Sequence, residues 1–215
     1  MTWHQILRER LADVLLAVPP DAPTLCEGWQ ARHLAAHVVL RQSSLVVGAG
    51  IVVPGLSSRA DRAIEELADT ATTEGAYRDL VARVAEPPGR WHPMGWAGDA
   101  ANVVEFYVHA EDVRRGAGPV PPPELDPELV EELWRHVLRT SGLALRKVPV
   151  GVVLVRDDGV RHPARRAKGE HGTVVVRGAV PEIVMWLLGR GAAADVRLEG
   201  AASDVAALSD RLPVA

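Results

Sequence analysis

The sequence is poor in residues that several classes of protein need in quantity. It has one cysteine, Cys26, in 215 residues, so no disulfide can form within the chain. It has two lysines against 22 arginines and a net charge of −4, so no overall basic field attracts nucleic acid. With no recognition helix evident either, the sequence argues against a DNA-binding regulator.

Long apolar segments are also missing. The longest runs, such as residues 45–56 (LVVGAGIVVPGL), contain glycine and proline and fall short of the ~20 residues of a membrane-spanning helix. The first 18 residues carry acidic side chains in an amphipathic pattern, unlike a signal peptide. Apolar residues still make up 47% of the chain, enough for a core. We expect a soluble cytoplasmic protein without a membrane partner. Its bias towards arginine, alanine and valine is typical of GC-rich bacterial genomes.

Helical periodicity dominates the first two thirds of the chain. A first helix carries Leu7, Leu11 and Leu15 and ends at the PPDAP segment, residues 19–23. Further helices are expected over about 30–47, 58–71 and 74–85, and another ends near residue 116. The proline- and glycine-containing segment 116–127 is the best linker candidate. After it, Asp126 caps a helix with proline at its first position.

From residue 148 the apolar period changes to that of strands. Strands are expected within 148–162, 172–178 and 194–200, and helices over 179–190 and 201–212. The predicted fold class is therefore an α bundle followed by a small α+β unit. We expect domains at residues 1–147 and 148–215.

Two predicted helices each carry a pair of ligand-type residues. His33 and His37 lie four positions apart, as do Glu105 and His109, so each pair shares one helix face. Helix bundles build metal sites from such inward-facing side chains, and imidazole and carboxylate suit zinc and similar divalent ions. A Glu–His pair at this spacing is equally compatible with a solvated surface contact or a satisfied hydrogen bond.

Other polar residues carry weaker signals. Cys26 is a candidate ligand or nucleophile, but a lone cysteine is more often a small buried apolar residue. The basic run 165–171 is typical of a solvated turn, and neither His162 nor His171 has an identifiable partner. Two further sets are candidates for pocket lining and for pairing with an acidic substrate: Trp91, His92 and Trp96, and Arg90, Arg114 and Arg115.

Three segments together resemble one family. Residues 25–39 (LCEGWQARHLAAHVV) resemble the GW-x-x-x-x-L-x-x-H segment of DinB-like proteins, in particular the mycothiol-dependent maleylpyruvate isomerase family. Residues 103–116 resemble that family's later segment, in which a Glu, a His four residues on and an Asp three further recur. The tail, 174–200, resembles its carboxy-terminal domain, with G-x-x-x-x-x-x-x-W-L-x-G-R leading into a strand.

The resemblance implies a DinB-like four-helix bundle followed by a sterol-carrier-like α+β domain. It implies one divalent metal, with zinc expected, held by His37, Glu105 and His109. His33 is not carried over as a ligand, because many relatives have another polar residue there. Asp112 matches the recurrent Asp and is expected to orient His109 or the helix end.

The chemistry that the resemblance implies is that of an actinobacterial thiol enzyme. A metal with an open coordination position stabilises the thiolate of mycothiol, which reacts with a small electrophile by isomerisation or thiol transfer. Three alternatives stay open: a non-catalytic metal-binding protein, a non-catalytic thiol-binding protein, and a carrier of an apolar ligand in the carboxy-terminal unit. That last unit is short for a cavity of ~300 Å³ or more. The chain is expected to be a monomer or a homodimer, with the apolar segment 46–56 as a candidate dimer face.

Overall fold

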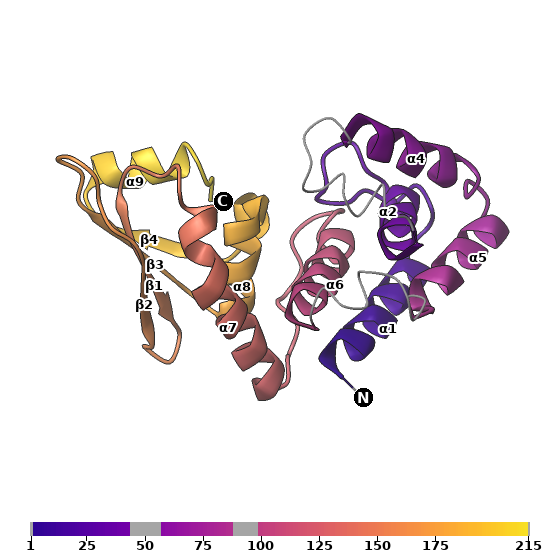
Figure 1. Ribbon diagram of the computed structural model, residues 1–215, viewed down its shortest axis with the longest axis horizontal. Coiled ribbons are helices and arrows are strands. Elements are labelled where there is room, and N and C mark those ends of the chain that lie inside the picture. Colours follow the sequence, from indigo (N-terminus) through magenta and orange to yellow (C-terminus); the bar gives the residue numbers. More distant parts are fainter. Residues whose placement is uncertain (1, 44–56, 88–98, 215) are drawn as a thin grey trace. The chain divides into compact units, whose positions relative to one another are not determined.

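The computed structural model describes residues 2–43, 57–87 and 99–214 and divides the chain into two compact units, residues 1–120 and 121–215 (Figure 1). The apolar segment 46–56 and the residues Arg90, Trp91, His92 and Trp96 lie outside the described residues. Among those described, no helix is long and apolar enough to cross a membrane.

Helices make up the first unit within its described residues, apart from loops, turns and one isolated β-bridge between Pro23 and Gln30. Its helices are α1 (Trp3–Leu16), α2 (Ala31–Ser43), α4 (Ser57–Asp69), α5 (Glu74–Ala85) and α6 (Asp99–Arg114). Helix α1 packs against α5 and α6, and α2 packs against α4 and α5. The predicted stripe Leu7, Leu11 and Leu15 is fully buried and forms the α1 side of this core.

The second unit is a mixed sheet with helices. Helix α7 (Pro127–Ala144) precedes strands β1 (Gly151–Arg156), β2 (Arg161–Arg165) and β3 (Thr173–Gly178). Helix α8 (Val180–Met185), a π turn (Trp186–Arg190) and a 3₁₀ turn (Gly191–Ala193) lead to β4 (Arg197–Glu199) and α9 (Ala202–Ser209). The strand order is β2-β1-β3-β4, with β1 and β3 parallel and the outer pairs antiparallel. This confirms the predicted α+β character of the tail.

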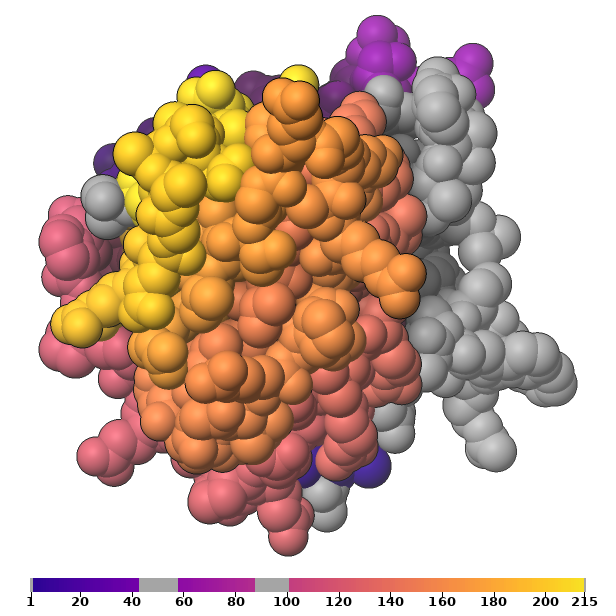
Figure 2. All heavy atoms as spheres, turned by 90° about the vertical axis from the view of Figure 1, so that its left-hand side faces the viewer, coloured from indigo at the N-terminus to yellow at the C-terminus, as the bar shows by residue number. Residues whose placement is uncertain are grey.

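The sheet and its helices share one apolar core. The β1 and β3 residues Val152, Leu154, Val174 and Val176 are fully buried, as is every residue of α8. Helices α7 and α8 lie on the same side of the sheet in Figure 1. Residues of the strands and of the carboxy-terminal segment, in orange and yellow, fill the centre of the face shown in Figure 2.

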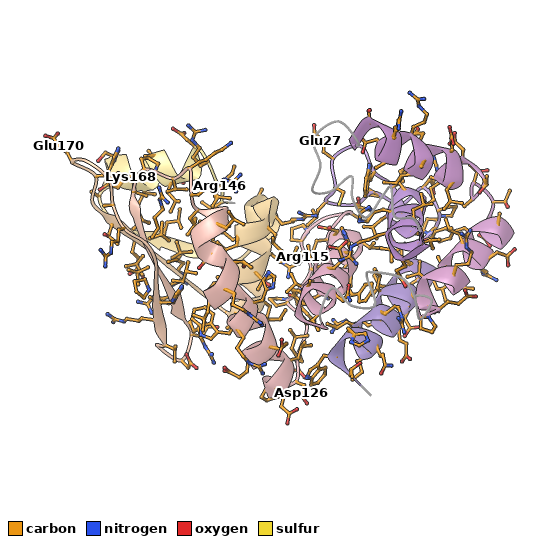
Figure 3. The ribbon with its side chains drawn as sticks, in the orientation of Figure 1. Glu27, Arg115, Asp126, Arg146, Lys168 and Glu170 are labelled. Carbon is orange, nitrogen blue, oxygen red and sulfur yellow. The ribbon has the colours of Figure 1, made fainter. Side chains whose placement is uncertain are left out.

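Local sequence explains where these elements begin and end. Asp126 caps α7 by accepting from the backbone N–H of Glu128 at 2.8 Å, as predicted, and Figure 3 labels it at the start of that helix. Gly189, within the π turn that follows α8, has a φ of +84°, a conformation that favours glycine. Lys168 and Glu170 lie exposed in the turn between β2 and β3, as predicted for the basic run.

The boundary between the units differs from the expected one at residues 147/148. It falls at Val120/Pro121, inside the segment 116–127 that the sequence marks as a linker. The reason is the packing of α7, whose apolar stripe contacts α8 and β2 of the second unit. An apolar stripe predicts that a helix is packed but does not say against which neighbour.

Candidate metal centre

Helices α2 and α6 bring three predicted ligands together. The carboxylate oxygen Oε1 of Glu105 lies 3.2 Å from Nε2 of His37 and 3.2 Å from Nε2 of His109. One ligand atom from each residue lies within 4.8 Å of the other two. Spacing alone predicts the pairing of Glu105 with His109 within α6, whereas His37 comes from 68 residues earlier in the chain.

Helix α6 is buried along most of its length, which makes a carboxylate within it costly unless it is paired. Its neighbours Val103, Val104, Phe106, Tyr107 and Val108 are all buried. The side chains of His37 and His109 are each 10% exposed, and the Glu105 side chain is 23% exposed. The two imidazoles are therefore largely shielded from water, whereas the Glu105 carboxylate remains accessible to solvent.

The His109 ring is held from its other side by a second carboxylate. Its Nδ1 donates to Oδ2 of Asp112 at 3.0 Å, and the Asp112 side chain is fully buried. The contact fixes which ring nitrogen faces Glu105. Asp112 thus contacts His109, as the resemblance implies, and the two residues lie at the i,i+3 spacing of neighbours on one helix face.

A cation in the cluster was not foreseen from the sequence. Nε of Arg41 lies 3.2 Å from Oε1 of Glu105, and its Nη1 donates to Oδ1 of Asn102 at 3.1 Å. Arg41 lies four residues after His37, so the helical spacing that paired the other residues would also have placed it on this face. Trp29 packs against His37, with ring centroids 5.2 Å apart.

These contacts shift the pKa values of Glu105, His37 and His109 in different directions. Burial opposes the ionisation of the carboxyl, but hydrogen bonds from both imidazoles and the charge of Arg41 hold the pKa of Glu105 well below its usual value. Burial lowers the pKa of His37 and outweighs its hydrogen bond to the carboxylate. Burial also opposes charge on His109, but its hydrogen bonds, the Asp112 bond first, raise the pKa of His109 well above its usual value.

The donor set fits a divalent ion such as zinc. Atoms that share a tetrahedral zinc ion lie ~3.3 Å apart, because each is about 2.0–2.1 Å from it. The two Nε2–Oε1 separations, 3.2 Å each, already match that spacing. Two imidazoles and one carboxylate, with an outer carboxylate on one imidazole, make the kind of set that leaves a coordination position open.

His33 lies outside this cluster, in keeping with its omission from the expected ligands. Its Nδ1 accepts from the backbone N–H of Gln30 at 3.2 Å, at the start of α2. Its Nε2 lies 3.9 Å from the carboxylate of Glu65 on α4. The His33 imidazole therefore contacts the start of α2 and the Glu65 carboxylate, and not the candidate metal centre.

The remaining candidates have structural partners. The guanidinium groups of Arg114 and Arg115 contact the buried carboxylate of Glu111, at 2.6 and 2.9 Å. Figure 3 labels Arg115, the residue directly after α6. His162 lies 3.3 Å from the hydroxyl of Ser141, and His171 lies 3.2 Å from the carboxylate of Asp204. Both histidines were left without partners by the sequence, because these contacts depend on tertiary packing.

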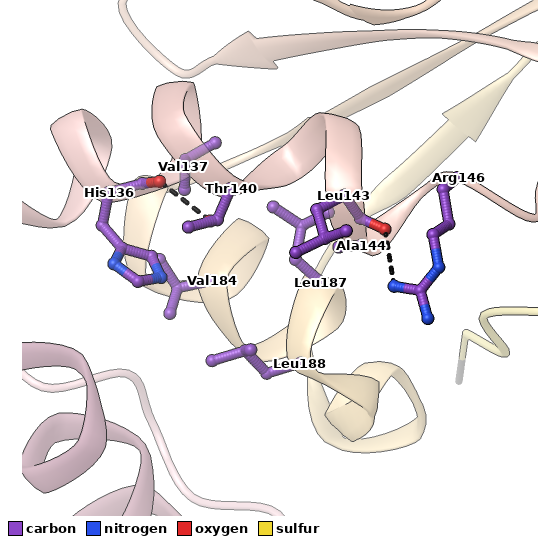
Figure 4. A pocket seen from close by; sticks show the side chains of 9 residues that line it. All are labelled: His136, Val137, Thr140, Leu143, Ala144, Arg146, Val184, Leu187 and Leu188. Carbon is purple, nitrogen blue, oxygen red and sulfur yellow. Dashed lines mark hydrogen bonds between the residues drawn. The ribbon is translucent and has the colours of Figure 1, made fainter. Parts of the chain in front are cut away.

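The second unit holds an apolar cavity of about 430 Å³, lined by residues of α7, of α8 and of the π turn after α8 (Figure 4). Aliphatic side chains such as Leu143 and Leu187 line it, with His136 and Arg146 among its polar residues. The expectation that the tail is short for a cavity above ~300 Å³ concerned residues 148–215 alone, and this cavity is not confined to them. Helix α7, assigned by the sequence to the first domain, supplies one of the cavity's walls.

Fold and cluster together define a two-unit protein with a helical candidate metal centre and a small mixed-sheet unit. Two crystal structures of the mycothiol-dependent maleylpyruvate isomerase share this fold. The one of a histidine-to-alanine mutant has a TM-score of 0.58 and 21% sequence identity, and the other has 0.54 and 20%. Each likeness covers 92% of this chain and 90% of the isomerase chain. No protein-family model matches the chain, and no curated protein matches it significantly.

Proposed function

We propose that the protein is a divalent-metal enzyme that uses mycothiol, or a similar small thiol. Its reaction would be isomerisation of a small electrophile or transfer of the thiol to it. The observation that carries the proposal is the convergence of His37, Glu105 and His109 on ligand-like spacings. The shared fold with the mycothiol-dependent maleylpyruvate isomerase supports the choice of thiol. A divalent ion with an open position, when bound, lowers the pKa of a coordinating thiol towards the reactive thiolate.

The chain's own residues supply binding and orientation in this scheme. His37 and His109 offer neutral nitrogens, and Glu105 offers an ionised oxygen. Asp112 keeps the His109 ring in place, and Arg41 holds the carboxylate of Glu105. Because the thiol is a separate small molecule, the protein needs no nucleophilic residue of its own.

We further infer a DinB-like four-helix bundle in the first unit and a sterol-carrier-like domain in the second. A closed ring of helix contacts supports the bundle. Helix α1 contacts α6, α6 contacts α2, α2 contacts α5, and α5 contacts α1. The mixed sheet with α8 packed on β3 supports the second assignment.

The proposal is tested with zinc-reconstituted protein, mycothiol and maleylpyruvate, followed by a panel of small electrophiles. We expect turnover that requires both metal and thiol and is lost in the Glu105→Ala variant. His33→Ala is the matched control, since that imidazole contacts Gln30 and Glu65 instead. Metal binding without turnover on the whole panel would favour the alternative, a non-catalytic metal- or thiol-binding protein.

A second candidate function rests on the cavity of the second unit. Its volume of about 430 Å³ falls in the range of small-molecule sites, and its lining is mostly aliphatic. Native mass spectrometry of the purified protein, before and after delipidation, tests for an apolar ligand. A bound mass that disappears in a Leu143→Asp variant would support a carrier role, and an empty protein would count against it.

A further inference from the structure

The proposed chemistry leaves unused a thiol that lies beside the candidate centre. Sγ of Cys26 lies 3.2 Å from Oδ2 of Asp112, the same oxygen that accepts from Nδ1 of His109 at 3.0 Å. The Asp112 side chain is fully buried, whereas Cys26 is half-buried. A thiol and an imidazole therefore converge on one buried carboxylate oxygen.

The backbone holds this thiol in a fixed position relative to α6. The N–H of Leu25 donates to the Asp112 carbonyl at 3.0 Å, and the N–H of Cys26 donates to Oγ1 of Thr24 at 3.2 Å. The N–H of Trp29 then closes a turn onto the Cys26 carbonyl at 2.9 Å. The loop is thus attached to α6 at the residue whose carboxylate the thiol contacts.

We propose that Cys26 is a positioning residue that holds the Asp112 carboxylate against His109 and so strengthens metal binding. The S–H donates to Oδ2, which restrains the carboxylate to the orientation in which that oxygen faces Nδ1. The imidazole then keeps Nε2 directed towards Glu105, with no reorientation needed when the ion binds. The inference rests on the proposed metal centre, but not on the thiol chemistry assigned to it.

The geometry also defines a competing role. Cys26, His109 and Asp112 form a second set whose ligand atoms lie within 4.8 Å of one another. If the ion were bound there, Cys26 would be a ligand rather than a positioning residue. Cobalt substitution separates the two, because a sulfur ligand adds a sulfur-to-cobalt charge-transfer absorption. The positioning role predicts no such band, and a band lost in Cys26→Ala would overturn it.

Zinc affinity of the full chain, measured by competition with a chromophoric chelator, gives the quantitative test. Asp112→Asn should weaken binding by about 10- to 100-fold, as loss of an outer carboxylate usually does. Cys26→Ala should weaken it by about three- to tenfold, because a thiol is a weak donor one step further out. Cys26→Ser should stay within about twofold of wild type, since its hydroxyl also donates. Glu27→Gln, an exposed neighbour on the same loop, is the control and should have no effect.

A double-mutant cycle shows whether the effect passes through Asp112. Cys26→Ala should cause no further loss of affinity in the Asp112→Asn background. An equal loss in both backgrounds, or wild-type affinity in Cys26→Ala, would overturn the inference and leave the metal centre standing. Failure of the wild-type chain to bind zinc would overturn both, whereas zinc binding without thiol turnover would overturn only the proposed enzyme.

Discussion

A single carboxylate oxygen organises the candidate centre. Oε1 of Glu105 takes part in the contacts with His37, His109 and Arg41, each at 3.2 Å. A partly buried carboxylate with this many donors has its charge compensated without an ion, so the metal-free cluster can stay folded. A divalent ion held by His37, Glu105 and His109 would take the place of the proton on His109.

This exchange predicts how zinc binding depends on pH. Because the pKa of His109 is raised, the metal-free protein keeps this ring protonated above the usual histidine range. The pKa of His37 is lowered, so that ring is already neutral near pH 7. Zinc needs neutral imidazole, so binding should release a proton from His109. Apparent affinity should then fall by up to about tenfold per pH unit below the pKa of His109.

Titration calorimetry in buffers of different ionisation enthalpy measures this proton release. We expect about one proton per zinc at pH 7 in the wild type. Asp112→Asn should release less, because the hydrogen bond that His109 donates to the Asp112 carboxylate raises the pKa of His109. Affinity that stays constant between about pH 6 and 8 would contradict proton release from His109 on zinc binding.

The sequence predicts the contacts of this cluster best where the two residues lie close together along the chain. The pair Glu105 and His109 follows from helical spacing, and the resemblance added His37 from a distant helix. The contact between Cys26 and Asp112 spans 86 residues and involves a lone cysteine, so nothing in the sequence favours it over simple burial. Arg41 was predictable from spacing but was hidden among many arginines.

At the scale of elements, the junction between the 23–30 loop and the end of α6 shapes the site. A Cβ added at Gly116 would lie 2.0 Å from the carbonyl oxygen of Pro23, too close for any real contact. Glycine therefore lets α6 end directly against the loop that carries Cys26 and Trp29. The role of this glycine is close approach, since it is not among the residues with positive φ.

The junction predicts opposite outcomes for two glycine substitutions. Gly116→Ala should destabilise the protein by about 1–3 kcal/mol, because backbone must move to admit the methyl group. Gly142→Ala is the matched control, since its added Cβ would lie 3.8 Å from the nearest atom, in ordinary contact. Within α7 that change should be neutral or stabilising by up to about 1 kcal/mol. Urea unfolding measures both, and equal effects would refute the tight junction.

Element prediction succeeded where periodicity and caps agree and failed where neighbours decide. Helix α5 has the expected bounds, and α7 begins at the proline after its predicted cap. Strand β2 (RHPAR) was not foreseen as a separate strand, because arginines and a proline hide it. It lies at the edge of the sheet, where proline is tolerated.

At the scale of the whole chain, the two units meet in an irregular segment rich in proline. Residues 117–126 form no helix or strand, and Glu124 within them is exposed. Limited digestion with a glutamate-specific protease should therefore cut after Glu124 and release fragments 1–124 and 125–215. Intact-mass spectrometry identifies the fragments, and Glu124→Gln should abolish the cut.

The same digestion distinguishes the two possible boundaries. If α7 belongs with the sheet, the fragment 125–215 should retain helix and strand signals by circular dichroism after separation. Resistance of the bond after Glu124, under conditions that cleave the exposed turn at Glu170, would contradict a boundary at residues 120/121.

The central claim is that α2 and α6 hold one divalent ion, and metal content tests it most directly. Inductively coupled plasma mass spectrometry on purified, zinc-reconstituted protein should find about one ion per chain in wild type and in His33→Ala. His37→Ala and Glu105→Ala should both lose it, because each removes one of three ligands from opposite helices. Wild-type protein without metal after reconstitution, or variants that retain the full ion content, would contradict the account.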